Sequence, residues 1–247
     1  MNLLRALAAS FSYFSILPIP HADEPPCDDA IGFLPIVGVV IGGLSGFGAY
    51  GIWLLTQNGI AATITAWVLS IALSGAIHVD GFLDCCDGLF VMASPRRRLE
   101  IMRDPHHGTY AFVGMVMLSA LWLYALAQIP PMMMPVVLAI TGYLGRAGGL
   151  IVAQTFVREG REEKVTVSRV ATVITGGVIA GIIGAFGRAR PMDVLVAALL
   201  AVPVSLVFGL FASRRLGGVV NGDCYGATIV VTEVALLLTY PALVQLR

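Results

Sequence analysis

The feature that most constrains the fold is a series of apolar runs, each about as long as a lipid bilayer is thick. A helix needs roughly 20 apolar residues to cross the hydrocarbon core of a membrane. The runs are continuous and do not alternate with polar residues, which favours helices over the strands of a barrel. We therefore expect an all-α, polytopic membrane bundle of about seven transmembrane helices. The predicted spans are residues 32–56, 61–79, 110–129, 131–153, 170–187, 192–211 and 227–245.

The composition agrees with a chain that lies mostly in lipid. Hydrophobic residues make up 57% of the chain and charged residues 12%, with a mean hydropathy of +0.87. The formal net charge of +0 argues against a nucleic-acid-binding surface. We expect residues 1–247 to form a single integral membrane domain, with the lipid bilayer as its surroundings.

The first 20 residues are predicted to form an amphipathic helix that lies in the membrane interface. Leucines and phenylalanines recur there at helical spacing, and the prolines at positions 18 and 20 would end the helix. A cleaved signal peptide is disfavoured, because the segment has one basic residue and no small-x-small cleavage site before the prolines.

The basic residues predict the orientation in the membrane. Cytoplasmic loops carry an excess of Lys and Arg. If 80–109 is cytoplasmic, the segments 157–169 and 213–226 lie on the same side, and the three together hold most of the positive charge. These residues are Arg96, Arg97, Arg98, Arg103, Arg158, Arg161, Lys164, Arg169, Arg214 and Arg215, against Arg188, Arg190 and Arg247 on the other side. We expect a multi-pass protein of the inner (plasma) membrane.

An acidic cluster follows the second span. Asp80, Asp84 and Asp87 stand at i, i+4 and i+7, so that on a helix they would project from roughly one face. Three carboxylates that close together repel one another unless a cation lies between them. Mg²⁺ prefers oxygen ligands and commonly acts on phosphate substrates. The cluster therefore predicts a membrane-embedded transferase of phosphoryl type that depends on Mg²⁺, or on Mn²⁺ in its place.

A polar segment before the third span holds Arg103, Asp104, His106 and His107. Asp104 could complete the metal shell, or it could form an interfacial ion pair with Arg103. The histidines also leave open a zinc site, although their spacing from His78, Cys85 and Cys86 matches no common ligand pattern.

A third segment, 217–227, surrounds Asn221 and Asp223 with glycines, as loops that approach phosphate do, although such a connector can also be a simple turn. Glu233 follows at membrane depth, and Arg146 lies within the fourth span. Charges at that depth are costly and usually functional. The two could pair with each other, or Arg146 could contact a diphosphate.

These segments resemble the cobalamin synthase family of adenosylcobinamide-GDP ribazoletransferases. That family has a His-Leu-Asp-Gly-x-x-Asp-x-x-Asp-Gly core, an Ile-Met-[Lys/Arg]-Asp-x-x-x-Gly-[Thr/Ser]-[Tyr/His] segment, and a Gly-Asp-x-x-Gly-Ala stretch followed by a glutamate in the membrane. Here they correspond to 78–88, 101–110 and 222–227 with Glu233. The resemblance covers nearly the whole chain. The histidines at 106 and 107 occupy variable positions, and 157–169 matches poorly.

The resemblance implies an enzyme that joins adenosylcobinamide-GDP to α-ribazole or its 5′-phosphate and releases GMP. It leaves open which acceptor is used and whether the protein is a homodimer. It implies that Asp80, Asp84, Asp87 and Asp104 are catalytic residues and Mg²⁺ ligands. It implies substrate contacts for His78, Arg103, His107, Arg146, Asn221, Asp223 and Glu233.

Two other functions remain as alternatives. A cation transporter or channel could use Glu233, Arg146 and the acidic cluster, but the two halves show no similar interrupted segments. A CDP-alcohol phosphotransferase holds paired metals with related Asp motifs. This chain lacks that family's Ala-Arg and its second Asp pair, so the likeness is one of mechanism.

Overall fold

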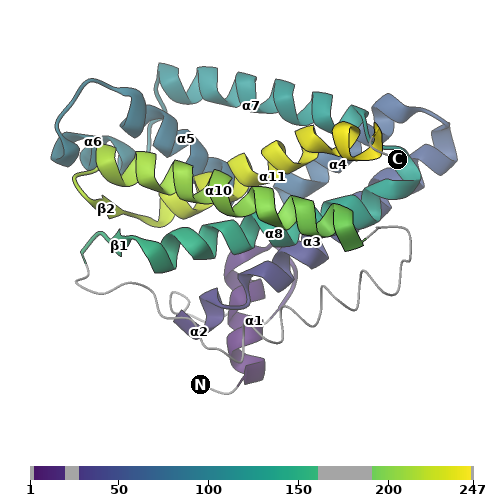
Figure 1. The fold of residues 1–247 in the computed structure, drawn as a ribbon, viewed down its shortest axis with the longest axis horizontal. Helices are drawn as coiled ribbons and strands as arrows, with labels where there is room; N and C mark the ends of the chain where they lie inside the picture. The colour runs from purple at the N-terminus through teal and green to yellow at the C-terminus, as the bar shows by residue number, and fades with distance from the viewer. Residues whose placement is uncertain (1–2, 20–27, 161–190, 246–247) are drawn as a thin grey trace.

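Long helices make up most of the structure, a computed structural model that describes residues 3–19, 28–160 and 191–245. Figure 1 shows the long helices running roughly side by side, with α1 crosswise to them. The helices are α1 (Leu3–Phe14), α2 (Asp28–Ile31), α3 (Leu34–Thr56), α4 (Gly59–Leu73), α5 (Ile77–Phe90), α6 (Pro95–Met102), α7 (Thr109–Ala127), the 3₁₀ turn η1 (Pro131–Met133), α8 (Met134–Thr155), α10 (Pro191–Arg215) and α11 (Gly222–Gln245).

The predicted class, a polytopic helical membrane protein, is confirmed. Within the described residues, five helical segments are long and apolar enough to cross a membrane, and α4 with α5 make a sixth if that bent pair is one span. The five are Leu34–Thr56, Thr109–Ala127, Pro131–Thr155, Val194–Arg215 and Gly222–Pro241. The expected span at 170–187 lies outside the described residues.

The predicted span 61–79 is wrong as a single helix. Helix α4 ends at Leu73, and α5 leaves it at an angle of 87°. Gly75 and Ala76 both take positive φ values, 62° and 59°. The backbone N–H of Ala76 donates to Ile71 and that of Gly75 to Ala72, the paired bonds of a Schellman helix end. The break matters because it turns the acidic cluster onto a separate helix that packs against α11.

Helices α3 and α8 pack closely along their backbones. A Cβ atom built on Gly38, Gly42 or Gly46 would lie 2.2, 2.0 or 2.5 Å from a backbone oxygen of α8. Small residues spaced four apart allow helix backbones to approach this closely in lipid, where packing replaces the hydrophobic effect. The two helix backbones are therefore in direct contact along this face.

The three polar segments meet at one end of the molecule (Figure 1). The short strands β1 (Val157–Arg158) and β2 (Val219–Val220) pair in parallel there. Arg215 donates to the carbonyls of Leu89 and Val91, and Arg103 forms an ion pair with Glu159. The described parts of the loops that were predicted to share one side of the membrane therefore lie together, with 157–160 as the described part of the second loop.

The N-terminal segment forms the predicted helix, which ends at Phe14, before the prolines. Ala6 packs on Phe33, and Phe11 packs on Val37 and Ile41 of α3. The chain after the helix is tied back by a bond from the backbone N–H of Ile16 to the carbonyl of Leu73. Helix α1 is thus fixed beside the break between α4 and α5.

Candidate active site

Close contact between α5 and α11 builds the polar centre of the site. A Cβ on Gly81 would lie 2.9 Å from the Cα of Asp223, and one on Gly226 would lie 3.2 Å from the Cα of His78. A side chain at position 81 would force the helices to shift, and one at position 226 would be tightly fitted. As a result of this close approach, Asp80 and Asp84 of α5 lie near Asp223, which is in the first turn of α11. The carboxylate of Asp84 is close enough to interact electrostatically with those of Asp223 and Asp80.

His107 stands between two of the carboxylates. Its Nε2 atom lies 3.5 Å from Oδ1 of Asp80, and its Nδ1 atom lies 3.6 Å from Oδ1 of Asp84. These distances are long for hydrogen bonds, so the attraction is mainly electrostatic and requires a protonated ring. The side chain of Asp84 is 16% exposed and that of Asp80 is 63% exposed. The carboxylate at position 80 is therefore the one open to solvent.

Both oxygens of Asp87, the third carboxylate, form hydrogen bonds with the protein backbone. Its two oxygens accept the backbone N–H groups of Gly108, at 2.5 Å, and Ala111, at 2.9 Å. Both belong to the start of α7, where the first N–H groups of a helix have no partner within the helix. Asp87 therefore caps α7, and it is only 8% exposed.

Arg103 and Asp104 do not form the ion pair that the sequence left open. Asp104 accepts the backbone N–H of His106 at 3.0 Å and lies 2.8 Å from its Nδ1 atom. These bonds hold the pKa of Asp104 below its usual value. Arg103 pairs with Glu159 instead. Asp104 lies with Asp87 in a hollow of about 290 Å³, separate from the cavity that Asp80 and Asp223 line.

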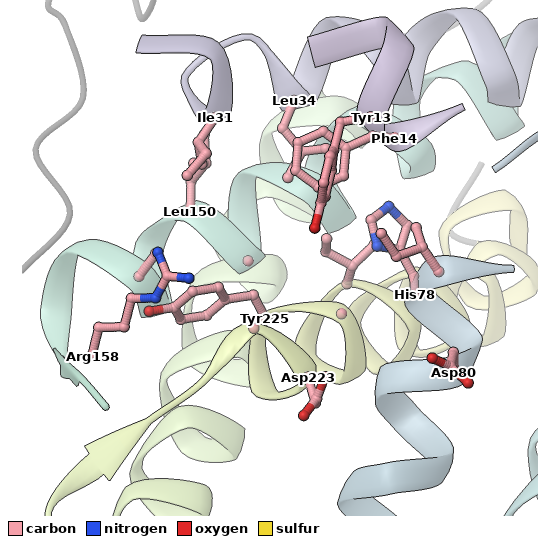
Figure 2. Close-up of a pocket in the computed structure, with 16 residues that line it drawn as sticks. Tyr13, Phe14, Ile31, Leu34, His78, Asp80, Leu150, Arg158, Asp223 and Tyr225 are labelled. Atoms are coloured by element: carbon pink, nitrogen blue, oxygen red, sulfur yellow. The ribbon is translucent and has the colours of Figure 1, made fainter. Parts of the chain in front are cut away.

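A cavity of about 680 Å³ opens beside Asp80 and Asp223, bounded by α1, α5, α8 and α11. Figure 2 shows Arg158 and Tyr225 on one flank, and Tyr13, Phe14 and His78 on the other. Asp80 and Asp223 lie along its lower edge in this view. The cavity therefore has a carboxylate edge, an arginine on one flank that can bind phosphate, and an aromatic wall that can contact rings.

Asn221 prepares the α11 end of the site. Its side-chain oxygen accepts the backbone N–H of Cys224 at 3.1 Å, and its amide donates to Oδ2 of Asp223 at 2.8 Å. Asn221 thus acts as an N-cap for α11 and orients the Asp223 carboxylate. Asp223 therefore lines the cavity, and Asn221 holds the side chain of Asp223 in place.

Arg146 and Glu233 pair with each other, which is one of the two arrangements that the sequence left open. Nη1 of Arg146 lies 2.7 Å from Oε1 of Glu233 and also donates to the carbonyl of Gly142. Both residues are buried, and neither lines the 680 Å³ cavity. The pair links α8 to α11 behind the site.

The aromatic and charged residues of the cavity wall that were not predicted as site residues are Tyr13, Phe14, Arg158 and Tyr225. In the sequence, Tyr13 and Phe14 belong to an amphipathic helix, and that pattern does not indicate what its apolar face contacts. Tyr225 lies inside the glycine-rich motif that was recognised for its Asp. Arg158 lies in the stretch that matched the family poorly, so no motif pointed to it.

The donor atoms of the cluster fit a hard divalent cation, because carboxylate oxygens are the ligands that Mg²⁺ prefers. Among the described residues, however, no three His, Cys, Asp or Glu side chains lie close enough together to surround one ion. The cysteines considered for zinc are buried elsewhere. Cys85 faces Cys224, and Cys86 packs on Gly114 of α7.

Comparisons with known proteins agree with the resemblance drawn from the motifs. The profile of the family described as cobalamin-5-phosphate synthase matches residues 6–241. A protein of Deinococcus radiodurans named adenosylcobinamide-GDP ribazoletransferase is 32% identical, over 96% of this chain and 85% of its own length. Proteins of the same name from Lachnoclostridium phytofermentans and Clostridium acetobutylicum are 30% and 27% identical, over 94% and 100% of this chain and 92% and 100% of their own lengths.

No solved structure gives a significant match. The family profile nevertheless spans all the elements that build the cavity, from α1 to α11. The chain belongs to the cobalamin-5-phosphate synthase family, and it is a multi-pass membrane transferase of cobalamin biosynthesis.

Proposed function

We propose that this enzyme transfers the adenosylcobinamide phosphoryl group from adenosylcobinamide-GDP to α-ribazole or α-ribazole 5′-phosphate. The names of the relatives support the substrates. The observation that carries the proposal is the carboxylate cluster at the edge of a cavity that also holds Arg158 and an aromatic wall. In this arrangement the phosphates would lie at Arg158 and the carboxylate cluster, and the ring systems would lie against the aromatic wall.

The reaction exchanges one P–O bond for another. The ribose 3′-hydroxyl of the acceptor attacks the phosphorus nearer the cobinamide, and a new O–P bond forms. The bond from that phosphorus to the bridging oxygen breaks, and GMP leaves with the oxygen. The hydroxyl proton passes to a carboxylate of the cluster, and Arg158 binds phosphate oxygens with its planar fork.

Mg²⁺, or Mn²⁺ in its place, is the proposed cofactor, held by Asp80 and Asp84. Asp87 and Asp104 were expected as further ligands, but they have partners within the protein, so the first two carry the proposal. A bound divalent ion would neutralise negative charge on the phosphate oxygens. The proposal places the site on the cytoplasmic side of the inner membrane, where nucleotides and Mg²⁺ are available.

The test is a reconstituted reaction. Full-length protein in lipid nanodiscs is incubated with adenosylcobinamide-GDP, Mg²⁺ and either acceptor, and GMP and the corrinoid product are measured by chromatography. We expect stoichiometric GMP and a cobalamin product with at least one acceptor, and almost none with Asp84→Asn. Folded wild-type protein that releases no GMP with either acceptor would overturn the proposal.

A further inference from the structure

Arg158 lies on one flank of the cavity (Figure 2), at the end of the short strand β1. Within the described residues, no carboxylate forms an ion pair with Arg158, so its charge is available to a substrate phosphate. The strand has only two residues, and its register pairs Arg158 with the buried Val220 of β2. The place of the Arg158 side chain therefore depends on what holds a very short segment of backbone.

Two contacts of Glu159 hold this segment directly after Arg158. The backbone N–H of Glu159 donates to the carbonyl of Val220 at 2.8 Å, and its carboxylate forms an ion pair with Arg103. The side chain of Glu159 is 22% exposed, and the residue does not line the cavity. The backbone bond thus ties the segment to β2, and the ion pair ties it to the end of α6.

Arg103 was expected to contact substrate, but its guanidinium pairs with Glu159. It lines neither the 680 Å³ cavity nor the 290 Å³ hollow. Arg103 is the C-cap of α6, and four residues later His107 reaches the carboxylates of α5. The ion pair therefore joins the two segments that bring His107 and Arg158 to the site.

We propose that Arg103 and Glu159 are positioning residues, whose ion pair fixes the backbone at Arg158 so that its guanidinium binds a phosphate of adenosylcobinamide-GDP. The inference rests on the proposed function, since it takes Arg158 as the group that binds this phosphate. An exposed ion pair adds little to stability, because water screens the charges. Its effect here is geometric, because a guanidinium binds two phosphate oxygens only when its planar fork is correctly oriented. The loss of the pair should therefore lower substrate affinity and leave folding intact.

The opposite charges of the pair separate positioning from a simple effect of charge. Glu159 lies close enough to Asp223 to interact with it electrostatically, so its charge lies near the site. Removal of a negative charge there favours a phosphate substrate, and removal of a positive charge disfavours it. An effect of charge alone would make Glu159→Gln lower the KM for adenosylcobinamide-GDP and Arg103→Met raise it. Positioning makes both variants raise the KM, because each breaks the same contact.

The test uses the full-length protein in nanodiscs, with adenosylcobinamide-GDP as the varied substrate. We expect Glu159→Gln and Arg103→Met each to raise its KM by about three- to tenfold, a part of the loss caused by Arg158→Met. The kcat and the unfolding midpoint should stay near the wild-type values. In an Arg158→Met background neither substitution should have a further effect, because the group that they position is gone. Glu100→Gln, which breaks exposed ion pairs within α6, is the matched control and should change none of these values.

Equilibrium dialysis with adenosylcobinamide-GDP gives a readout that does not need turnover. The dissociation constant should rise by a similar factor in Glu159→Gln and in Arg103→Met. That pattern in a protein that releases no GMP would support the positioning role while the proposed reaction failed. Changes of opposite sign in the two variants, an equal further loss in the Arg158→Met background, or wild-type affinity in both would overturn the positioning role even if the wild-type reaction proceeds.

Discussion

Asp84 and Asp87 lie on the same helix, three residues apart, but the structure gives them different partners. Asp84 faces His107 and the other carboxylates, whereas Asp87 accepts two backbone N–H groups of α7. Asp84→Asn should lower turnover by at least about 100-fold at limiting Mg²⁺, with partial recovery at high Mg²⁺. Titration of activity with Mg²⁺ checks this.

Asp87→Asn should behave as a lost helix cap. An asparagine oxygen can accept one of the two N–H groups, but its amide cannot accept the other. We expect a loss of about 1–2 kcal/mol in the free energy of unfolding. The Mg²⁺ concentration for half-maximal activity should stay unchanged. A shift in that concentration as large as the one for Asp84→Asn would show that Asp87 is a metal ligand.

Arg146 and Glu233 form a buried ion pair, so the loss of one charge should cost more than the loss of both. Glu233→Gln leaves the guanidinium buried without its counter-charge, which should lower stability by about 3–5 kcal/mol. The double variant Arg146→Met, Glu233→Gln should recover much of this loss. Thermal unfolding of the purified variants in one detergent compares them. Wild-type stability in Glu233→Gln would contradict a structural role for the pair.

At the scale of elements, the contact between α3 and α8 offers a matched pair of glycines. A Cβ on Gly42 would lie 2.0 Å from the carbonyl oxygen of Leu138, whereas one on Gly43 would meet no atom within 4 Å. Gly42→Ala should force the helices apart and lower the unfolding midpoint by several degrees. Gly43→Ala should leave it unchanged or raise it slightly, since alanine favours helix. Equal midpoints for the two variants would contradict the close packing.

The spacing of residues along the sequence predicted the helices and part of the site. It could not predict which helices and loops contact one another. Asp80 and Asp84 share a face because residues four apart on a helix do, and both reach His107. The capping of α7 by Asp87 and the position of α1 depend on packing between distant segments, which no spacing reveals. The break after α4 had a local signal, since Gly75 is a typical helix terminator, but the apolar run continued past it.

At the scale of the whole molecule, the polar loops meet at one end, so all of them must face the same side of the membrane. The segment 91–108, the strands β1 and β2 and the carboxylate cluster all lie at that end. Whichever side one of these loops faces, the others face too. The excess of Arg and Lys in these loops predicts the cytoplasmic side.

Two single cysteines test this orientation in intact cells. With Cys27, Cys85, Cys86 and Cys224 changed to alanine, Met92→Cys places a thiol on the exposed loop at the carboxylate end. Gln128→Cys places one at the far end of α7, where the residue is also exposed. A membrane-impermeant maleimide should label Gln128→Cys in intact cells and Met92→Cys only after lysis. The reverse pattern would place the carboxylates outside, away from cytoplasmic nucleotides, and would contradict the proposed reaction along with the orientation.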